Sequence, residues 1–287
     1  MNTNGNAYTV IYTTVVVALV AAILAFVAMA LKPKQDANVK AETISQMLTA
    51  AQFYTKDECS AMGNDKVLEA YSQNIKEAYT IGLDGKKVRD LSTDVKNIEL
   101  QDGLKAQNKN IKNGANADLS VYVFNKDGKA VTVVPAYGAG LWGPVWGYIA
   151  LDEDLQTIVG AYFDHESETP GLGAKIKDDP SFRAEFIGKK INLSGDPVFS
   201  VVKVGTATDP ESSVDAITGA TMTSKGLGDA IAFWLKAYVP FLSSAAPAHE
   251  CCGGKGGDCD GSKPCCKGAS ESGCCSDSAA VKCPVTE

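Results

Sequence analysis

A cluster of hydroxyl side chains precedes the last apolar segment of the chain. Residues 215–226 read DAITGATMTSKG, and the apolar run after them ends FWLKAYVPFL. Thr223 or Ser224 is the expected N-cap of a helix, whose apolar face is then formed by Leu227, Ala230, Ile231, Trp234 and Leu235. A helix N-terminus presents unpaired amides and the positive end of the helix dipole, which favour a phosphate. A plain capping turn has the same spacing, so both interpretations stay open.

A glycine-rich segment, 138–143, reads GAGLWG and fits the G-x-G-x-x-G pattern of dinucleotide-binding loops. In such loops the third glycine opens a helix whose amides face the pyrophosphate. Residues 144–149, PVWGYI, alternate as a strand does, so we reject a dinucleotide site. We expect the glycines to admit a flat ligand or another strand, with Trp142 and Trp146 either stacking on that ligand or buried in the core.

A second glycine-rich loop, 168–173, reads ETPGLG. Its Pro-Gly pair predicts a tight turn, and the glycines on both sides of Leu172 leave amides accessible and direct that side chain outward. An ordinary β-turn is the alternative to a ligand-binding loop.

Cysteine placement limits the redox chemistry that the protein's own side chains can perform. Eight of the nine cysteines lie between Cys251 and Cys283, and the ninth is Cys59. Residues 60–250 therefore offer no thiolate for an iron–sulfur cluster, a zinc site or a redox pair. His165 and His249 lack partners at metal-ligand spacing, so we assign no metal ligand. Any electrons carried by this part of the chain require an added cofactor.

The C-terminal segment contains paired cysteines among Gly, Ser, Lys and Asp, without an apolar pattern that could form a core. It has no C-x-x-C spacing, so a defined zinc module is unsupported. We expect a disordered tail that electron transfer does not need, with soft-metal binding or disulfides as alternatives.

The N-terminus predicts a membrane anchor. Residues 10–31 carry no charge and match the roughly 20 apolar residues that a helix needs to cross a bilayer. A cleaved signal peptide, with 28–30 as an A-x-A site, and a buried soluble helix are the alternatives. The signal peptide is disfavoured because nothing basic precedes the run. Lys32, Lys34 and Lys40 follow it, so charge bias alone would place the remaining chain in the cytoplasm.

The chain between anchor and tail predicts an α+β fold. A helical face is formed by Ile44, Met47, Leu48 and Ala51. We expect a second helix over 65–80, a polar surface excursion over 94–118, and a hairpin of strands 119–124 and 130–135 joined at an Asp-Gly turn. Further strands are predicted over 145–151, 157–163 and 198–204.

These features divide the chain into four parts. Residues 1–34 form the anchor, 35–130 a membrane-proximal helical and polar segment of the soluble domain, 131–243 a cofactor-binding domain, and 244–287 the Cys-rich tail. The net charge of −7 and pI near 5.0 leave no basic face for a nucleic-acid partner.

The string from Asp215 to Thr221, DAITGAT, resembles the D-x-x-[ST]-G-A-[ST] signature of proteins that carry flavin mononucleotide (FMN) on a threonine through a phosphoester bond. Four further segments resemble the C subunit of the bacterial Na⁺-translocating NADH:quinone reductase: GLW at 140–142, ETPGLG at 168–173, the 188–190 turn, and FWL at 233–235. This likeness runs from the anchor to about Leu242. ETPGLG and TGAT also occur in the G subunit of the related Rnf electron-transport complex, which is an alternative.

The resemblance implies a covalent flavoprotein. It makes Thr221 the FMN attachment site, puts Thr218, Gly219 and Ala220 in the phosphate turn, and places the remaining site residues around the flavin ring: Leu141, Trp142, Glu168, Thr169 and Leu172. It also implies a separate Mg²⁺-dependent transferase that uses FAD as donor.

The family likeness further implies an electron relay within a membrane complex. Other subunits would oxidise NADH, move Na⁺ and reduce quinone, so this chain has no catalytic residues of its own. The resemblance places the soluble domain on the periplasmic side of the inner membrane, against the lysine bias. A membrane-anchored metal-binding or redox-sensing protein is an alternative from another functional class.

Overall fold

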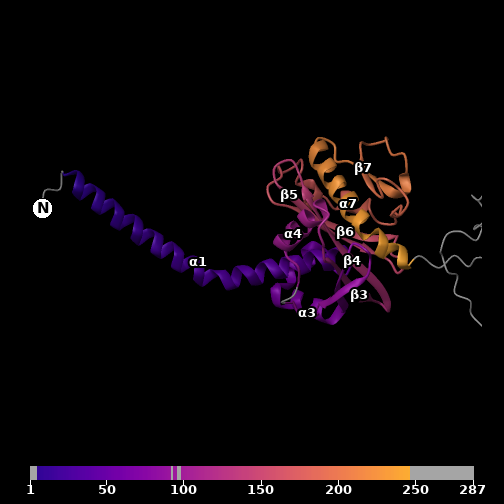
Figure 1. The fold of residues 1–287 in the computed structure, drawn as a ribbon, viewed down its shortest axis with the longest axis horizontal. Helices are drawn as coiled ribbons and strands as arrows, with labels where there is room; N and C mark the ends of the chain where they lie inside the picture. Colours follow the sequence, from indigo (N-terminus) through magenta and orange to yellow (C-terminus); the bar gives the residue numbers. More distant parts are fainter. Residues whose placement is uncertain (1–4, 92, 96–97, 246–287) are drawn as a thin grey trace, which may run out of the picture. The chain divides into compact units, whose positions relative to one another are not determined.

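The computed structural model describes residues 5–91, 93–95 and 98–245. Its elements, in chain order, are α1 (Asn6–Ala50), α2 (Lys56–Met62), α3 (Asn64–Asn74), β1 (Ile75–Ile81), β2 (Lys87–Leu91), α4 (Gln101–Lys112), β3 (Leu119–Lys126), β4 (Lys129–Ala139), β5 (Pro144–Leu151), β6 (Ile158–His165), α5 (Lys175–Asp178), α6 (Pro180–Ala184), β7 (Ser200–Val202), the 3-10 turn Pro210–Ser212, β8 (Ser213–Asp215), α7 (Thr221–Leu242) and the 3-10 turn Ser243–Ala245. The α+β fold class is confirmed (Figure 1).

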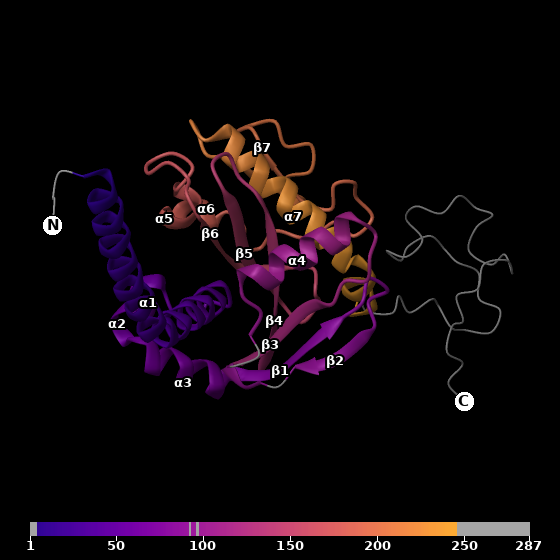
Figure 2. The ribbon, with the colours of Figure 1, turned by 60° about the vertical axis from the view of Figure 1, so that its left-hand side comes forward.

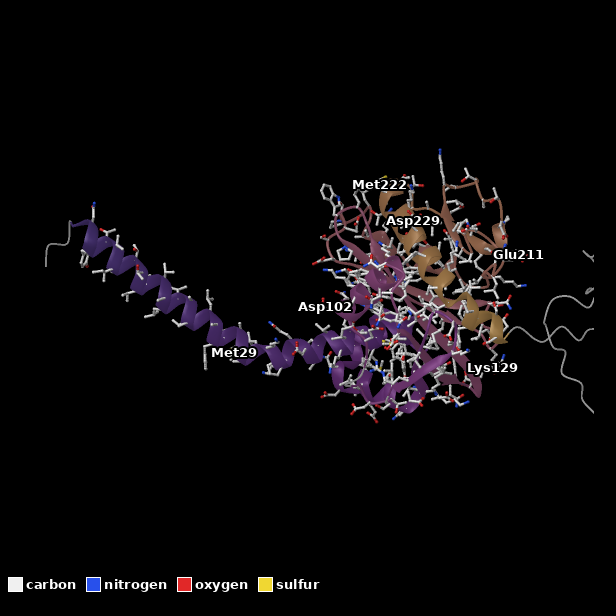
Figure 3. The ribbon with its side chains drawn as sticks, viewed as in Figure 1. Met29, Asp102, Lys129, Glu211, Met222 and Asp229 are labelled. Carbon is white, nitrogen blue, oxygen red and sulfur yellow. The ribbon has the colours of Figure 1, made fainter. Side chains whose placement is uncertain are left out.

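Helix α1 has two different parts. Its residues 10–31 are exposed, and Figure 3 shows the side chains around Met29 with no other element beside them. This apolar part is long enough to cross a membrane. The last turns are buried on most sides, and the predicted face is among the buried residues, since Ile44, Met47 and Leu48 have no exposed surface. The predicted helical face over 44–51 is therefore confirmed.

The domain is built on a six-stranded antiparallel sheet in the order β2-β1-β3-β4-β5-β6. The predicted hairpin is confirmed as β3 and β4, whose turn has positive φ at Asp127 (52°) and Gly128 (87°), as a tight hairpin turn requires. The strands expected over 145–151, 157–163 and 198–204 are also present, as β5, β6 and the short β7. Strand β7 pairs with β8 in a separate parallel ribbon.

Helices α1 and α7 lie on opposite faces of this sheet. A Cβ built on Gly138 of β4 would lie 2.5 Å from the Cβ of Ala230, so this position faces α7. Gly138 pairs with Val145, and Trp146 is the next residue of β5, so it points to the other face. Trp146 there bonds to Gln46 of α1. Figure 2 shows the sheet between the two helices.

The helix expected over 65–80 is wrong in its second half. Helix α3 ends at Asn74, and the residues after it form β1, between β2 and β3. Ile75 and Tyr79 therefore pair with Phe124 and Val121 of β3 instead of extending a helical face. Strand pairing on both edges overrides a helical periodicity that the local sequence also satisfies.

The surface excursion expected over 94–118 contains a helix. Helix α4 buries Leu104 and Asn108, and the Asn108 Oδ1 accepts a hydrogen bond from Trp234 Nε1 at 3.2 Å. Its remaining faces are mostly polar, which explains why composition suggests a loop. The spacing of Leu104, Asn108 and Ile111 is the available helical signal.

Candidate functional site

Thr221 is the first residue of α7. The N-cap is Ala220, without a side-chain cap, so the expected capping by Thr223 or Ser224 is wrong. A turn in which the Ala220 amide donates to the Ile217 carbonyl at 3.0 Å brings the chain into the helix three to four residues earlier than expected. The first helical bond runs from the Ser224 amide to the Ala220 carbonyl, so the amides of residues 221–223 precede the helical ladder.

The hydroxyls around this helix start differ in their surroundings. Thr223 is 2% exposed, and its hydroxyl donates to Glu168 Oε2 at 2.6 Å. Ser224 is fully buried, and its hydroxyl accepts the Ile217 amide at 3.1 Å. Thr218 and Thr221 are exposed. Within the TGAT string and the first turn of α7, Thr218 and Thr221 are therefore the residues whose hydroxyls an external reagent can reach.

The carboxylate of Glu168 joins three chain segments. Glu168 is buried, and its Oε1 accepts the Trp142 amide at 2.9 Å while its Oε2 accepts the Thr223 hydroxyl. One side chain therefore connects the GAGLWG loop, the ETPGLG loop and the first turn of α7. Charge-assisted bonds of this kind are stronger than bonds between neutral groups.

Two glycines provide the space for this carboxylate. A Cβ on Gly173 would lie 2.5 Å from Glu168 Oε2 and 2.6 Å from Thr223 Oγ1. A Cβ on Gly140 would collide with Glu168 Oε1. Gly140 and Gly173 thus let the two loops approach one buried acid, whereas a flat ligand or another strand was expected at the first loop. The expected absence of a helix after Gly143 is confirmed, because β5 begins at Pro144.

The ETPGLG loop lies beside the TGAT string. Gly219 has a φ of 85°, and a Cβ there would lie 3.2 Å from Leu172 Cδ2. Within the loop, the Thr169 carbonyl accepts the amides of Leu172 and Ala174, and Gly171 has a φ of 76°. Leu172 points outward, as predicted.

Exposed apolar side chains come from every segment of the site. They are Leu141, Trp142, Leu172 and Met222. Figure 3 shows Met222 at the start of α7. Trp142 is 67% exposed, whereas Trp146 is 6% exposed and bonded to Gln46, so Trp146 is a core residue and its proposed stacking role is wrong. Apolar surface of this kind next to an exposed hydroxyl fits a flat aromatic ligand.

His165 has a structural role that its sequence context does not reveal. Its Nδ1 accepts the Glu168 amide at 3.2 Å, which fixes the start of the ETPGLG loop. No spacing rule predicts this contact, because it depends on where β6 ends. His249 lies outside the described residues, as do the cysteines from Cys251 onward.

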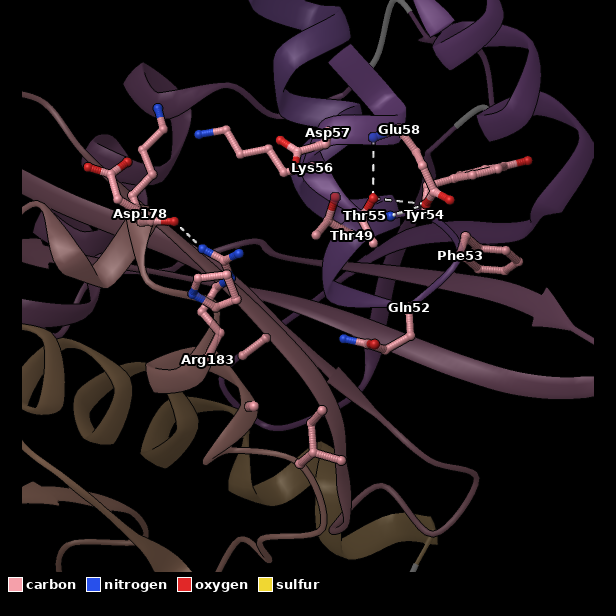
Figure 4. Close-up of a pocket in the computed structure, with 15 residues that line it drawn as sticks. Thr49, Gln52, Phe53, Tyr54, Thr55, Lys56, Asp57, Glu58, Asp178 and Arg183 are labelled. Carbon is pink, nitrogen blue, oxygen red and sulfur yellow. Dashed lines mark hydrogen bonds between the residues drawn. The ribbon is translucent and has the colours of Figure 1, made fainter. Parts of the chain in front are cut away.

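A cavity of about 740 Å³ lies elsewhere, between the α1–α2 corner and α5–α6. Figure 4 shows Lys56 and Arg183 extending into it from different elements. Burial, then the nearby charge of Lys177, lower the pKa of Lys56. The lining holds three cationic side chains, including Lys177, and three anionic ones, Asp57, Glu58 and Asp178, so their formal charges balance. None of the site residues described above lines this cavity.

Comparisons with known proteins agree with this geometry. A family model described as an FMN-binding domain matches residues 140–236, which include residues 140–143 of the GAGLWG loop, the whole ETPGLG loop and most of α7. The C subunit of the Na(+)-translocating NADH-quinone reductase of Vibrio vulnificus strain YJ016 is 30% identical over 237 residues, covering 77% of this chain and 88% of that protein.

Two crystal structures have the same architecture. The C subunit of the Na(+)-translocating NADH-quinone reductase from Parabacteroides distasonis has a TM-score of 0.62 and 35% identity, covering 74% of this chain and 97% of that one. Shewanella oneidensis NqrC has a TM-score of 0.57 and 27% identity, covering 73% of this chain and 98% of that one. This chain therefore belongs to the family of C subunits of the Na(+)-translocating NADH-quinone reductases.

Proposed function

We propose that this chain is an electron-carrying subunit of a Na⁺-translocating NADH:quinone reductase and holds FMN through a phosphoester to Thr221. The observation that carries the proposal is the position of Thr221: an exposed hydroxyl on the first residue of a 22-residue helix, beside four exposed apolar side chains. The reductase is favoured over the Rnf alternative because the relatives described above, from Vibrio vulnificus and Parabacteroides distasonis, are C subunits of the reductase.

The residues present fit the phosphate end of FMN. The amides of residues 221–223 and the positive end of the α7 dipole favour a phosphate dianion. Gly219 supplies a positive φ that residues with a side chain rarely adopt, and Ala220 keeps the approach to Thr221 open. Transfer from FAD would join Thr221 Oγ to the flavin-side phosphorus and release AMP, with the hydroxyl proton passing to a base of the transferase.

The residues also fit the ring end. Leu141, Trp142 and Leu172 provide apolar surface, while Glu168 and Thr169 hold the loops that carry them. Bound FMN supplies reversible electron transfer, and the protein contributes orientation and electrostatics. A covalent link keeps such a carrier from dissociating at an exposed site.

We further propose a periplasmic soluble domain, with the other reductase subunits, an FAD-dependent flavin transferase and the lipid bilayer as partners. The tail-centred alternative, a metal-binding or redox-sensing protein, concerns residues outside the described ranges. Flavin fluorescence of the protein after SDS gel electrophoresis distinguishes a covalent flavoprotein from that alternative, because only a covalently bound flavin stays with the denatured chain.

The test is flavin fluorescence of the protein after SDS gel electrophoresis, with the transferase co-expressed. Wild type and Thr218→Ala should fluoresce, because each retains the Thr221 hydroxyl, whereas Thr221→Ala should lose the signal. Thr218→Ala is the matched control, since it removes the other exposed hydroxyl of the TGAT string. A signal that persists in Thr221→Ala, or no signal in wild type, would refute the proposal.

A further inference from the structure

An unbroken series of hydrogen bonds joins the anchor helix α1 to the start of α7. It begins at Gln46, whose Oε1 accepts Trp146 Nε1 at 3.2 Å and whose Nε2 donates to Asp164 Oδ2 at 2.8 Å. Gln46 is 4% exposed and lies on a buried stretch of α1 that also contains the apolar Ile44, Met47 and Leu48. A buried amide with both of its ends bonded fixes the position of the helix that carries it.

Asp164 is the junction of the series. Its Oδ2 also accepts Lys177 Nζ at 2.8 Å, and its Oδ1 accepts the amide of His165 at 2.8 Å. Asp164 is 3% exposed, and these donors satisfy both of its buried carboxylate oxygens. A cavity of about 490 Å³ is lined by Gln46, Trp146 and Asp164, so solvent lies close to these bonds.

The series continues into the flavin loops. The ring of His165 accepts the amide of Glu168, and the Glu168 carboxylate binds the Trp142 amide and the Thr223 hydroxyl. Thr223 is two residues from Thr221. Residues from α1, β6, the ETPGLG loop and α7 are thus linked by successive hydrogen bonds, and the path passes from backbone amide to side chain within His165 and within Glu168.

Hydrogen bonds fix the position of α1 along the sheet, which apolar packing alone does not do. Ile44, Met47 and Leu48 hold α1 on the sheet, but the hydrophobic effect has no preferred direction and tolerates small shifts of a helix along a surface. Hydrogen bonds lose strength with small changes of distance and angle. The Gln46 contacts therefore select one register of α1 against β5 and β6.

We propose that Asp164 is a positioning residue, which through Gln46 and His165 holds the loops at 140–143 and 165–173 in register with the anchor helix. The purpose assigned to this link rests on the proposed function, since it would keep the cofactor at a fixed place relative to the membrane-bound complex. The link itself is a property of the polypeptide and does not require the flavin.

Hydrogen exchange of the full chain in detergent micelles, produced without the transferase, tests the link. The amides of Trp142, His165 and Glu168 each donate one bond of the series, so each reports its own contact. Gln46→Met removes both polar ends at similar length. We expect these three amides to exchange about 5-fold faster or more, which is the loss of roughly one hydrogen bond, while the β3–β4 hairpin amides change no more than in the control.

The matched control is Thr43→Val, a buried residue of the same helix whose hydroxyl bonds only the Val39 carbonyl. A rescue variant combines Gln46→Glu with Asp164→Asn and Lys177→Met. The carboxylate moves to α1, acceptors remain for the Trp146 and His165 N–H groups, and the Lys177 ammonium, for which the new amide nitrogen would be no acceptor, is removed. Its three reporter amides should return to within about 2-fold of wild type. If Gln46→Met does not fold, the exchange of the three reporter amides is measured in Asp164→Asn instead. In either orientation, the new amide loses one hydrogen bond of the series, either the one from Gln46 or the one from the His165 amide.

Unchanged exchange at the three reporter amides would overturn the proposal. An equal increase across the sheet would also overturn it, because Gln46 would then contribute to overall stability only. Either result leaves the attachment of FMN to Thr221 untouched, since the protein measured carries no flavin.

Discussion

At the scale of single residues, the environment of each hydroxyl distinguishes the threonines and the serine that begin α7. The buried Thr223 and Ser224 are committed to Glu168 and to the Ile217 amide, respectively. Thr221 is exposed at a helix N-terminus, where a phosphate is favoured. The proposed selectivity for Thr221 thus follows from burial and hydrogen bonding in addition to the sequence signature.

Thr223→Val should destabilise the domain. The substitution keeps the shape of the side chain but leaves Glu168 Oε2 buried without its donor, which costs about 1–3 kcal/mol of unfolding free energy. Urea unfolding measures this cost, with the exposed Thr218→Ala expected within about 0.5 kcal/mol of wild type. Equal stabilities for Thr223→Val and wild type would show that the Glu168 contact contributes nothing.

Glu99 should make the stability depend on pH. Burial raises the pKa of Glu99 above its usual 4.5, although a hydrogen bond from the Ser120 hydroxyl opposes the shift. The folded state then binds more protons than the unfolded state, so this contribution is complete below about pH 4.5 and is lost as pH rises through the raised pKa. Glu99→Gln should remove this decrease of stability with rising pH. Urea midpoints of both proteins, measured from acid to neutral pH, test this. The same dependence of the midpoint on pH in both proteins would contradict the prediction.

The residues of the site are predictable to different degrees. The DAITGAT and ETPGLG strings carry recognisable chemistry, and the structure brings them together through Leu172 and Gly219. The contact of His165 is not predictable, because its ring acts through a single backbone amide. The stacking prediction for Trp146 failed because the sequence does not state which face of β5 this residue occupies.

At the scale of elements, α7 approaches the sheet through residues without bulky side chains. A Cβ on Gly226 would collide with the carbonyl oxygen of Ala139, and Gly138 faces Ala230. The other end of α7 is equally close, since Gly85 in the β1–β2 turn lies against Pro240 and Phe241. This packing sets the distance between the Thr221 helix start and the GAGLWG loop.

Gly226→Ala should be destabilising, although alanine is the better helix former by about 1 kcal/mol. The added methyl group meets backbone, which cannot rotate away, so we expect a net loss of about 1–3 kcal/mol. Chemical denaturation checks it, with the exposed neighbour Lys225→Ala as control. A gain in stability would mean that α7 and β4 have room to separate.

Secondary structure is predictable where a local sequence signal determines it, and it is mispredicted where pairing with distant segments determines it. The β3–β4 hairpin is predictable because Asp127 and Gly128 supply the turn themselves. Strand β1 has a helical pattern, and its pairing with β2 and β3 is not visible in its own sequence. Helix α4 is difficult to predict because only a narrow face of it is apolar.

At the scale of the molecule, one helix combines a part that is long and apolar enough to cross a membrane with a part that is buried in the domain core. Residues 10–31 are exposed and uncharged, whereas Ala41 and most residues from Thr43 to Leu48 are buried. We propose that 35–130 and 131–243 are parts of one soluble domain, because β3 and β4 pair across that boundary.

Deletion of residues 2–34 should yield a protein that stays in the supernatant after ultracentrifugation and unfolds cooperatively, because it keeps the buried turns of α1. Deletion of residues 2–50 should yield a protein without a cooperative unfolding transition, because it removes Ile44, Met47 and Leu48 from the core, at a cost of several kcal/mol of unfolding free energy. Melting curves of the two proteins compare them. A cooperative transition in the longer deletion would show that α1 is dispensable to the fold.

The central claim is the ester at Thr221, and the mass of the tryptic peptide covering residues 204–225 tests it most directly. From protein made with its transferase, the account predicts a peptide heavier by one FMN less one water, with fragment ions that locate the addition at Thr221. An unmodified peptide, or an addition located on Thr218, Thr223 or Ser224, would contradict it.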